Sequence, residues 1–352
     1  MRVREMGIEE IGIGMNRDRR KRSMRRWKTL RKWLLPGLTV LCLLAVGQAV
    51  EAQEYPAQSI TLIIDRPPGS GTDVLSRVIT PMASKILGQE IVPLNKPGAG
   101  GAVGTGILAS SKPDGYTILA HTVSGLTVVP HIEKVSYDPL KDVIPIIHFG
   151  TFHCAVMIRA DSPHKTFKDL VDHARKNPGK VSFGIVGVGN APHLDFEIVL
   201  QQEKIDVPIV PFGGAPPTLT ALLGGHVTAA GVGASNWMPN YRAGKVRLLA
   251  TTTEKRILPE VPALREFGYP FYNLSTEYYL VSVPKGTPAS VVAKLEGAYR
   301  KAMETPEFQK TATTLYVHEP NPLSKEGLKG LVETLYQKNG EIIQKAKIGK
   351  QG

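Results

Sequence analysis

The sequence predicts an α/β protein built from two lobes. From Tyr55 onward, short apolar runs rich in valine and isoleucine alternate with helical patterns, and turns containing glycine and proline separate them. This alternation is typical of helices packed on largely parallel sheets. The 300 residues that follow residue 52 exceed the usual size of one layered domain, so two lobes are expected.

The apolar runs and the helical patterns place the elements in order along the chain. We expect strands at Ile60–Ile64, Glu90–Pro93, Thr117–Ala120, Ala155–Arg159, Val181–Ile185, Ile209–Val210, Val227–Val232, Val246–Thr251 and Tyr278–Val283. We expect helices at Asp73–Leu87, Ala102–Ser111, Phe167–Lys176, His193–Gln202, Pro216–Leu223, Trp237–Arg242, Pro288–Glu304 and Lys325–Lys345. Thr166 is placed to cap one of these helices, and Asn177-Pro178-Gly179 ends the same helix.

The first 52 residues have the layout of a secretory signal peptide. Ten basic residues between Arg17 and Lys32 precede the apolar run Leu34–Val46. This run of about 13 residues is too short to span a bilayer comfortably, and the small residues Val50 and Ala52 favour cleavage before Gln53. We therefore expect residues 1–52 to be removed on export to the periplasm, with a retained anchor helix as the alternative.

Most of the basic charge belongs to this signal segment. The chain has 43 Lys+Arg and 31 Asp+Glu, and residues 1–52 hold 12 and 5 of them, which leaves a net charge of +5 in place of +12. No stripe of basic residues with interleaved aromatics remains, so nucleic-acid binding is not expected. Cys154 is the only cysteine after residue 52. An exported chain of this size without disulfides suits a bacterial periplasm.

Glycine clusters occur in four of the turns between an expected strand and an expected helix. They are Gly69 with Gly71, Gly98 with Gly100 and Gly101, Gly187 with Gly189, and Gly213 with Gly214. Glycine lets a ligand approach the main chain, and a helix start offers unpaired N–H groups that favour anions. Each loop alone could be a tight turn. Four together favour a ligand site, because ligands of open α/β sheets bind beyond the carboxyl ends of the strands.

Motifs for catalysis, nucleotides and metals do not fit these loops. None ends in the Gly-Lys-Ser/Thr of a phosphate-binding loop, and the glycines of residues 98–104 lack dinucleotide spacing. The stretch Gly233–Trp237 breaks the Gly-x-Ser-x-Gly pattern of hydrolases, and the nine histidines lack metal-ligand spacing. We expect no catalytic residue, no cofactor and no metal. An exported α/β hydrolase that uses Ser235 is the alternative from another class.

Neutral donors near the loops are the candidate ligand-binding side chains. They are Ser70, Thr72, Thr122, Ser124, Asn190 and Ser235. Such groups, together with main-chain N–H groups, hold a carboxylate through charge-assisted hydrogen bonds without any chemistry on it. The alternative for each hydroxyl is a helix N-cap, and for Thr72 this alternative is nearly as strong as ligand contact. His193 is the one histidine placed at a helix start beside a glycine loop.

Eight short motifs occur together in register along the chain. They are Tyr55-Pro56 with Ile60–Ile63, then Pro68–Asp73, Asn95–Gly101, Lys112–Thr117, Tyr137–Asp142, Leu222–Val227, Ala243–Arg247 and Pro284–Pro288. In this order they resemble the Bug family, the extracytoplasmic solute receptors of tripartite tricarboxylate transporters. The resemblance covers essentially all of residues 53–352. No single motif is specific, but eight in register are.

The resemblance implies a periplasmic-binding-protein fold of the second type. In that fold, two lobes, each a mixed sheet flanked by helices, are joined by two hinge strands and close on a small carboxylate. Residues 53–149 and 276–352 would form the first lobe and residues 150–275 the second, with hinge strands at Ile146–Phe149 and Glu277–Leu280. The implied function is that of a monomeric receptor for membrane transport subunits. A receptor for a membrane sensor kinase would look the same.

The resemblance also implies which residues hold the ligand. The first loop would cradle one carboxylate, and closure would bring it and Ser124 against the loops of the second lobe. The full candidate set is Gly69, Ser70, Gly71, Thr72, Asp73, Thr122, Ser124, Gly187, Gly189, Asn190, His193, Gly213, Gly214 and Ser235. The side chain of Asp73 is expected to organise the helix start, since its carboxylate would repel a carboxylate ligand.

Two departures from the family bear on the ligand. Family members usually have an apolar-aromatic approach to the first loop where this chain has Asp65-Arg66, and Gly-Ser-Ala-Gly where it has Gly184-Ile185-Val186-Gly187. We therefore hypothesise a ligand with one well-held carboxylate and an apolar or aromatic body. Arg66 is a candidate additional anchor through its bidentate fork. The competing interpretation, slightly favoured, is that Arg66 pairs with Asp65 or Asp73 at the surface.

Overall fold

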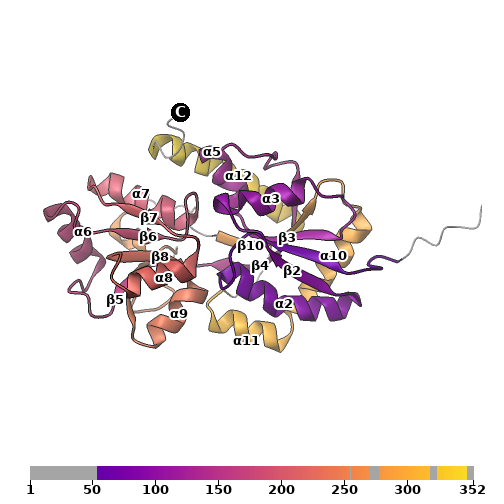
Figure 1. Cartoon of the computed structure of the whole chain (residues 1–352), viewed down its shortest axis with the longest axis horizontal. Coiled ribbons are helices and arrows are strands. Elements are labelled where there is room, and N and C mark those ends of the chain that lie inside the picture. The colour runs from indigo at the N-terminus through magenta and orange to yellow at the C-terminus, as the bar shows by residue number, and fades with distance from the viewer. Residues whose placement is uncertain (1–53, 254, 270–276, 318–322, 347–352) are drawn as a thin grey trace, which may run out of the picture. The chain divides into compact units, whose positions relative to one another are not determined.

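The computed structural model describes residues 54–253, 255–269, 277–317 and 323–346. Tyr55–Gly352 form one compact unit, and every helix and strand labelled in Figure 1 belongs to it. The expected signal peptide, residues 1–52, lies outside the described residues. Within the described part of the chain, no helix combines the length and the apolarity needed to cross a bilayer.

The first sheet has five strands in the order β2-β1-β3-β10-β4 (Figure 1). Their bounds are Ile91–Asn95 for β2, Ile60–Ile64 for β1, Thr117–Thr122 for β3, Glu277–Pro284 for β10 and Val143–Phe152 for β4. β1 pairs in parallel with β2 and β3, whereas β10 runs antiparallel to both β3 and β4. The first sheet therefore includes β10, a strand from far downstream in the sequence, between β3 and β4.

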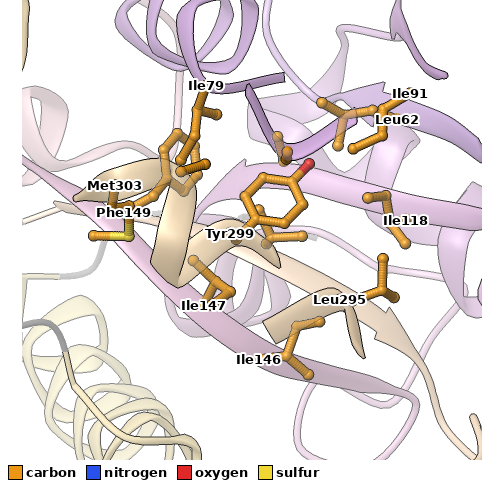
Figure 2. Close-up of a cluster of buried hydrophobic side chains, with 14 of the residues drawn as sticks. Leu62, Ile79, Ile91, Ile118, Ile146, Ile147, Phe149, Leu295, Tyr299 and Met303 are labelled. Atoms are coloured by element: carbon orange, nitrogen blue, oxygen red, sulfur yellow. The ribbon is translucent and has the colours of Figure 1, made fainter. Parts of the chain in front are cut away.

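Helices cover both faces of the first sheet. They are α2 (Gly71–Leu87), α10 (Ala289–Met303) and α11 (Pro306–Thr314) on one face, and α3 (Ala102–Ala109) and α12 (Lys325–Ala346) on the other. Successive side chains of a strand point to opposite faces. Leu62 and Ile64 accordingly belong to the core cluster under α2 and α10, and Ile63 to the cluster under α3 and α12. Figure 2 shows the first cluster, with Leu295 and Tyr299 of α10 lying among the isoleucines of the sheet.

The second sheet repeats this topology in the order β7-β6-β8-β5-β9. The bounds are Ile209–Pro211 for β7, Phe183–Ile185 for β6, Ala229–Gly233 for β8, Cys154–Arg159 for β5 and Val246–Thr251 for β9. Its helices are α6 (Phe167–Lys176), α7 (Ala191–Glu203), α8 (Ala215–Leu223) and α9 (Ala234–Arg242). β6 pairs in parallel with β7 and β8, and β5 runs antiparallel to β8 and β9. The expected α/β fold with two mixed sheets flanked by helices is confirmed.

The passage between the sheets lies later than the expected hinge strand. Ile147 and His148 pair with Val281 and Leu280, so Ile146–Phe149 and Glu277–Leu280 are both parts of the first sheet. β4 ends at Phe152 and β5 begins at Cys154, so the chain enters the second sheet at His153. The reason is burial: Ile146, Ile147 and Phe149 of β4 lie in the core of the first lobe.

Polar side chains cap the starts of α2, α6 and α7, and the cap of α2 lies earlier in the sequence than expected. Ser70 caps α2, where its Oγ accepts from the N–H of Asp73 at 3.3 Å, so the interpretation of Thr72 as the cap was wrong. Asn190 caps α7, and Thr166 forms the expected capping box of α6. Among the described residues, three α-helices were missed: α4 (Ser124–Thr127), α5 (Val129–Ile132) and α11. The first two are single turns, too short to carry a helical pattern.

Candidate functional site

A cavity of about 430 Å³ lies where loops of the two lobes meet. The loops follow β1, β2 and β3 of the first sheet and β6, β7 and β8 of the second. The wall comprises Asp65, Arg66, Pro67, Ser70, Gly71, Thr72, Pro97, Gly98, Ala99, Gly100, Gly101, Thr122, Glu133, Val186, Gly187, Val188, Asn190, Pro192, Pro211, Phe212, Gly213, Gly214, Ala215, Asn236, Glu277 and Tyr279. Apart from Glu277 and Tyr279 of β10, these residues lie at or beyond the carboxyl ends of parallel strands, the usual position of a ligand in α/β sheets.

The cavity wall contains many of the residues that the sequence singles out. Arg66, Ser70, Gly71, Thr72, Thr122, Gly187, Asn190, Gly213 and Gly214 line it. Gly69, Asp73, Ser124, Gly189 and Ser235 are not among the lining residues. His193 also lies outside this wall: its Nδ1 accepts from the N–H of Gly189 at 3.2 Å, and its Nε2 is 3.6 Å from Glu197 beside another hollow. His193 is thus turned away from the cavity.

The carboxylate of Asp73 supports the first loop from behind. Its Oδ2 accepts from the N–H of Gly69 at 2.9 Å, and its Oδ1 accepts from Arg77 at 2.8 Å and from Asn95 at 2.9 Å. Asn95 also donates to the carbonyl of Arg66. The acid therefore organises the helix start, as its charge led us to expect, and faces away from the lining.

The first turn of α2 presents main-chain donors to the cavity. Gly71 and Thr72 occupy this turn and line the wall, and N–H groups at such positions have no helical acceptor. A Cβ at Gly71 would lie 2.1 Å from the hydroxyl oxygen of Tyr279 and 2.7 Å from that of Ser235. Only a glycine allows the start of α2 to meet β10 and the second lobe so closely.

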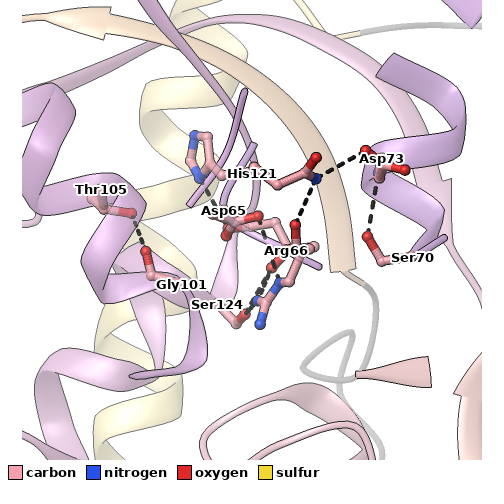
Figure 3. Close-up of polar contacts among 10 residues, drawn as sticks. Asp65, Arg66, Ser70, Asp73, Gly101, Thr105, His121 and Ser124 are labelled. Atoms are coloured by element: carbon pink, nitrogen blue, oxygen red, sulfur yellow. Dashed lines mark hydrogen bonds and ion pairs between the residues drawn. The ribbon is translucent and has the colours of Figure 1, made fainter. Parts of the chain in front are cut away.

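Arg66 lies against the cavity in a network of polar side chains (Figure 3). Its Nη2 donates to Thr122 Oγ1 and, over 3.1 Å, to Ser124 Oγ, and its Nε is 3.6 Å from Asp65 Oδ1. The Arg66 side chain is 14% exposed. The interpretation that Arg66 pairs with Asp65 is confirmed, but Asp65 is buried and Arg66 is only partly exposed, so the pair does not lie at the surface. Because Arg66 also borders the cavity, it remains a candidate anchor.

Asp65 is a buried acid at the edge of this network. Burial raises the pKa of Asp65 to about 7, against the opposing effect of the Arg66 guanidinium and with a further rise from Glu277. An acid with this pKa exchanges its proton near neutral pH. Asp65 is thus a second charged feature of the cavity, next to Arg66.

The loops of the second lobe supply an apolar wall. Val186, Val188, Pro192, Pro211 and Phe212 line it, and among the described lining residues this lobe contributes no charged side chain. Asn190 is committed to the loop itself, since its Nδ2 donates to the carbonyl of Gly187 at 2.6 Å and its Oδ1 accepts from the N–H of His193. Its amide shapes the loop beside the cavity.

Direct contacts join the lobes around the cavity. Asn236 of α9 donates from Nδ2 to the carbonyl of Gly69 at 2.9 Å. A Cβ at Gly214, whose φ is +132°, would lie 2.5 Å from Pro67 Cγ. The two lobes therefore contact each other around the cavity.

Several lining residues were missed by the sequence analysis. The loop Pro97–Gly101 had a signal, because its glycines form one of the four clusters. Glu277 and Tyr279 had none, since they lie on a strand that inserts antiparallel beside β3 from far downstream. Asn236 follows the candidate Ser235 directly and could have been grouped with it.

Comparisons with known proteins agree with this architecture. The model of the tripartite tricarboxylate transporter family receptor matches residues 75–348. A UPF0065 protein of Cupriavidus necator is 33% identical over 328 residues, which cover 93% of this chain and 99% of that protein. The structure of the periplasmic binding protein BugD superposes with a TM-score of 0.79 at 29% identity, covering 84% of this chain and all of BugD. The structure of an R. palustris protein solved with adipate superposes with a TM-score of 0.78 at 26% identity, covering 84% of this chain and 99% of that protein.

The family model spans most of the chain, and the structural agreement extends over both lobes. The resemblance drawn from the eight motifs is therefore confirmed. This chain belongs to the Bug and TctC family of tripartite tricarboxylate transporter receptors.

Proposed function

We propose that this chain is a monomeric periplasmic receptor that captures a small organic carboxylate by lobe closure and presents it to the membrane subunits of a tripartite tricarboxylate transporter. The observation that carries the proposal is the start of α2, which faces a cavity bordered by both lobes. The solved structure of an R. palustris relative with adipate supports a carboxylate as the ligand. The description of the related BugD as a periplasmic binding protein supports a periplasmic location for this chain.

The first loop has the chemistry of a carboxylate seat. The N–H groups of Gly71 and Thr72 lie at the positive end of the α2 dipole, which favours an anion. The Ser70 side chain caps this same turn, and the Arg66 guanidinium borders the same cavity. Arg66 keeps its contacts to Thr122 and Ser124, so it is held in place before a ligand arrives. This preformed arrangement supports one well-held carboxylate.

The second lobe favours an apolar body on the ligand. Its contribution to the wall is aliphatic, aromatic or main-chain, apart from the amides of Asn190 and Asn236. A ligand that touches both lobes stabilises the closed form by its preference for that form over the open one. We assign no reaction to Ser235, whose hydroxyl lies 3.2 Å from Asn236 Oδ1 in a hydrogen bond.

Thermal unfolding of the protein purified from the periplasm tests the proposal. A library of small mono- and dicarboxylates, adipate and aromatic acids included, should contain acids that raise the melting temperature. At about 100 times its dissociation constant, a ligand adds roughly 2.7 kcal/mol to the free energy of unfolding. Deletion of the gene should abolish uptake of the same acids. A library without any stabilising acid would contradict the receptor function, and citrate binding better than aromatic monocarboxylates would contradict the apolar body.

A further inference from the structure

The loop Gly187–Asn190 of the second lobe separates the cavity from a second hollow. Val188 lines both the cavity and this outer hollow of about 560 Å³, whereas Gly187 and Asn190 line the cavity. The loop joins β6 to α7, and its two glycines have positive φ, +144° at Gly187 and +77° at Gly189. Glycine has no side chain that restricts its main chain, so the side chains that bind this loop decide where the cavity wall lies.

Two side chains from the start of α7 bind the main chain of this loop. Asn190 donates from Nδ2 to the carbonyl of Gly187 at 2.6 Å, and His193 accepts at Nδ1 from the N–H of Gly189 at 3.2 Å. The two contacts are coupled, because Asn190 Oδ1 also accepts from the main-chain N–H of His193. His193 therefore fixes the second half of the loop, although its ring does not line the cavity.

The bond to Gly189 determines where the proton of the His193 ring lies. A main-chain N–H only donates, so Nδ1 must accept and the proton of the neutral ring is on Nε2. Nε2 lies 3.6 Å from Glu197 Oε1, and both side chains line the outer hollow. A second proton would have to bind Nδ1, where it would face the N–H of Gly189. Protonation of the ring therefore breaks this hydrogen bond.

The loop has little room to shift while it touches the first lobe. A Cβ at Gly189 would lie 2.4 Å from Ile132 Cδ1, and a Cβ at Gly100 would lie 3.0 Å from the carbonyl oxygen of Val188. Ile132 also shares a buried apolar cluster with Leu194 of α7. A loop displaced by protonation would collide with α5 or lose these contacts, so the arrangement in which the lobes touch favours the neutral ring.

The charged groups around His193 act on the same equilibrium. Among the described residues, Glu197 is its ion-pair partner, and a protonated ring gains from this acid while it loses the bond to Gly189. Histidine is the residue type whose charge ordinarily changes between pH 5 and pH 8. Charged or titratable groups on the elements around His193 include Glu197 and Asp195 of α7, Asp206 at the outer hollow, His131 and Glu133 at α5, and Lys345 of α12.

We propose that His193 is a positioning residue of the receptor, whose neutral ring holds the loop Gly187–Asn190 in the shape that borders the cavity and meets the first lobe. Protonation of the ring releases the loop and lowers the affinity for an acid in the cavity. This inference rests on the proposed receptor function and adds a control by pH to the same site.

Nitrogen NMR of the histidine rings tests the hydrogen bond without a ligand. In the labelled protein purified from the periplasm, His193 at pH 8 should have an unprotonated Nδ1 and a protonated Nε2. The amide signal of Gly189 should shift as the ring takes up a proton between pH 8 and pH 5.5, and this shift should be absent in His193→Asn. A neutral ring with its proton on Nδ1, or a Gly189 signal that does not follow the ring, would overturn the inference.

Variants separate this positioning role from a general structural one. Asparagine places Oδ1 where histidine has Nδ1, so His193→Asn keeps the acceptor for Gly189 and loses the titration, whereas His193→Leu loses both. His226→Asn, at an exposed histidine of the second lobe, is the matched control. Isothermal titration calorimetry with benzoate and with adipate measures the affinity, and comparing the variants at one pH cancels any change in the acids themselves.

The affinity should depend on pH only where the ring of His193 is present. Between pH 8 and pH 5.5 the wild-type affinity should fall about three- to tenfold relative to His193→Asn, the size of one lost hydrogen bond. His226→Asn should follow the wild type, and His193→Leu should bind more weakly than both at pH 8. If His193→Leu does not fold, His193→Asn and the NMR titration decide.

The outcomes distinguish this inference from the receptor function. Acids that bind with the same pH dependence in wild type and His193→Asn would overturn the inference and keep the receptor. So would a His193→Asn affinity that is as low as that of His193→Leu at pH 8. If benzoate and adipate do not bind, the acid that most raises the melting temperature replaces them. A protein that binds no acid at pH 8 would overturn the receptor function, whereas the NMR titration would still confirm or overturn the hold of His193 on the loop.

Discussion

The two lobes share one sheet topology and yet contribute opposite chemistry to the cavity. In each lobe three parallel strands carry the loops that face the cavity, and a fourth strand pairs antiparallel beside them. All the charged side chains of the described lining come from the first lobe, whereas the second provides valine, proline and phenylalanine. The fold thus fixes where the loops meet, and the residues within the loops decide that one lobe lines the cavity with charged side chains and the other with apolar ones.

The largest expected effect that tests this contrast comes from Asp65, the buried acid of the first lobe. The folded pKa of Asp65, about 7, is raised above its usual value of 3.8, so the folded state favours the protonated acid. The resulting stabilisation is complete below pH 3.8 and is lost as the pH rises through 7. Each pKa unit corresponds to about 1.4 kcal/mol, so the free energy of unfolding should fall by a few kcal/mol across this range.

Urea unfolding between pH 4 and pH 8 measures this effect. Asp65→Asn removes the titrating group, so the difference in unfolding free energy between variant and wild type should shift in favour of the variant as the pH rises. The groups that act on the pKa of Asp65 are Arg66, Glu277 and the backbone donors of Thr122 and of Asp65 itself. Asp206→Asn, at an exposed acid of the second lobe, is the matched control and should follow the wild type. If the unfolding free energies of wild type and Asp65→Asn changed with pH in parallel, the pKa of Asp65 would not be raised in the folded state.

The next largest effect compares one glycine from each lobe. Gly71→Ala places a methyl group 2.1 Å from the buried Tyr279 hydroxyl and 2.7 Å from Ser235, whereas a Cβ at Gly213 meets nothing within 4 Å. Overpacking of this kind costs about 1–3 kcal/mol, which is about 5- to 150-fold in affinity if closure bears the cost. Gly71→Ala should therefore weaken binding of any stabilising acid, measured by calorimetry, and Gly213→Ala, which also lines the cavity but meets no protein atom, should weaken it less. Equal affinities for the two variants would remove the start of α2 from the site.

A smaller effect comes from the hydrogen bond that joins the lobes. Asn236→Ala removes the 2.9 Å bond to the carbonyl of Gly69, and a bond of this kind contributes about 0.5–1.5 kcal/mol. Affinity should fall about two- to tenfold, chiefly through faster dissociation in stopped-flow measurements. Asn240→Ala is the control, because Asn240 donates to the carbonyl of Asn236 within the same helix. An unchanged dissociation rate in Asn236→Ala would mean that the lobes are held together by the ligand and apolar contacts alone.

Local sequence signals predicted the parts of this site that are built locally. The run Ile60–Ile64 and the Ser-Gly-Thr-Asp start of α2 are adjacent in sequence, so strand, loop and cap could be placed together. Glu277 and Tyr279 could not be placed, because only the tertiary pairing of β10 with β3 brings them to the cavity. Arg66 shows the limit most clearly. Its local sequence allowed either an ion pair or a ligand anchor. In the structure the guanidinium is paired with Asp65 and also lines the cavity.

The smallest effect tests whether the charge contrast extends to the outer surface of the first lobe. Arg77 pairs with Asp73 at 2.8 Å, but its side chain is 46% exposed, and exposed pairs of this spacing contribute about 0.3–0.5 kcal/mol. Asp73 keeps the N–H of Gly69 and the amide of Asn95 when Arg77 is removed. Arg77→Ala should therefore change the free energy of unfolding by about 0.5 kcal/mol or less, and the affinity for an acid by less than about twofold. A tenfold loss of affinity would instead mean that the loop depends on a solvent-exposed cation, and the distinction between the lobes would then lie in their surfaces as well as in the cavity wall.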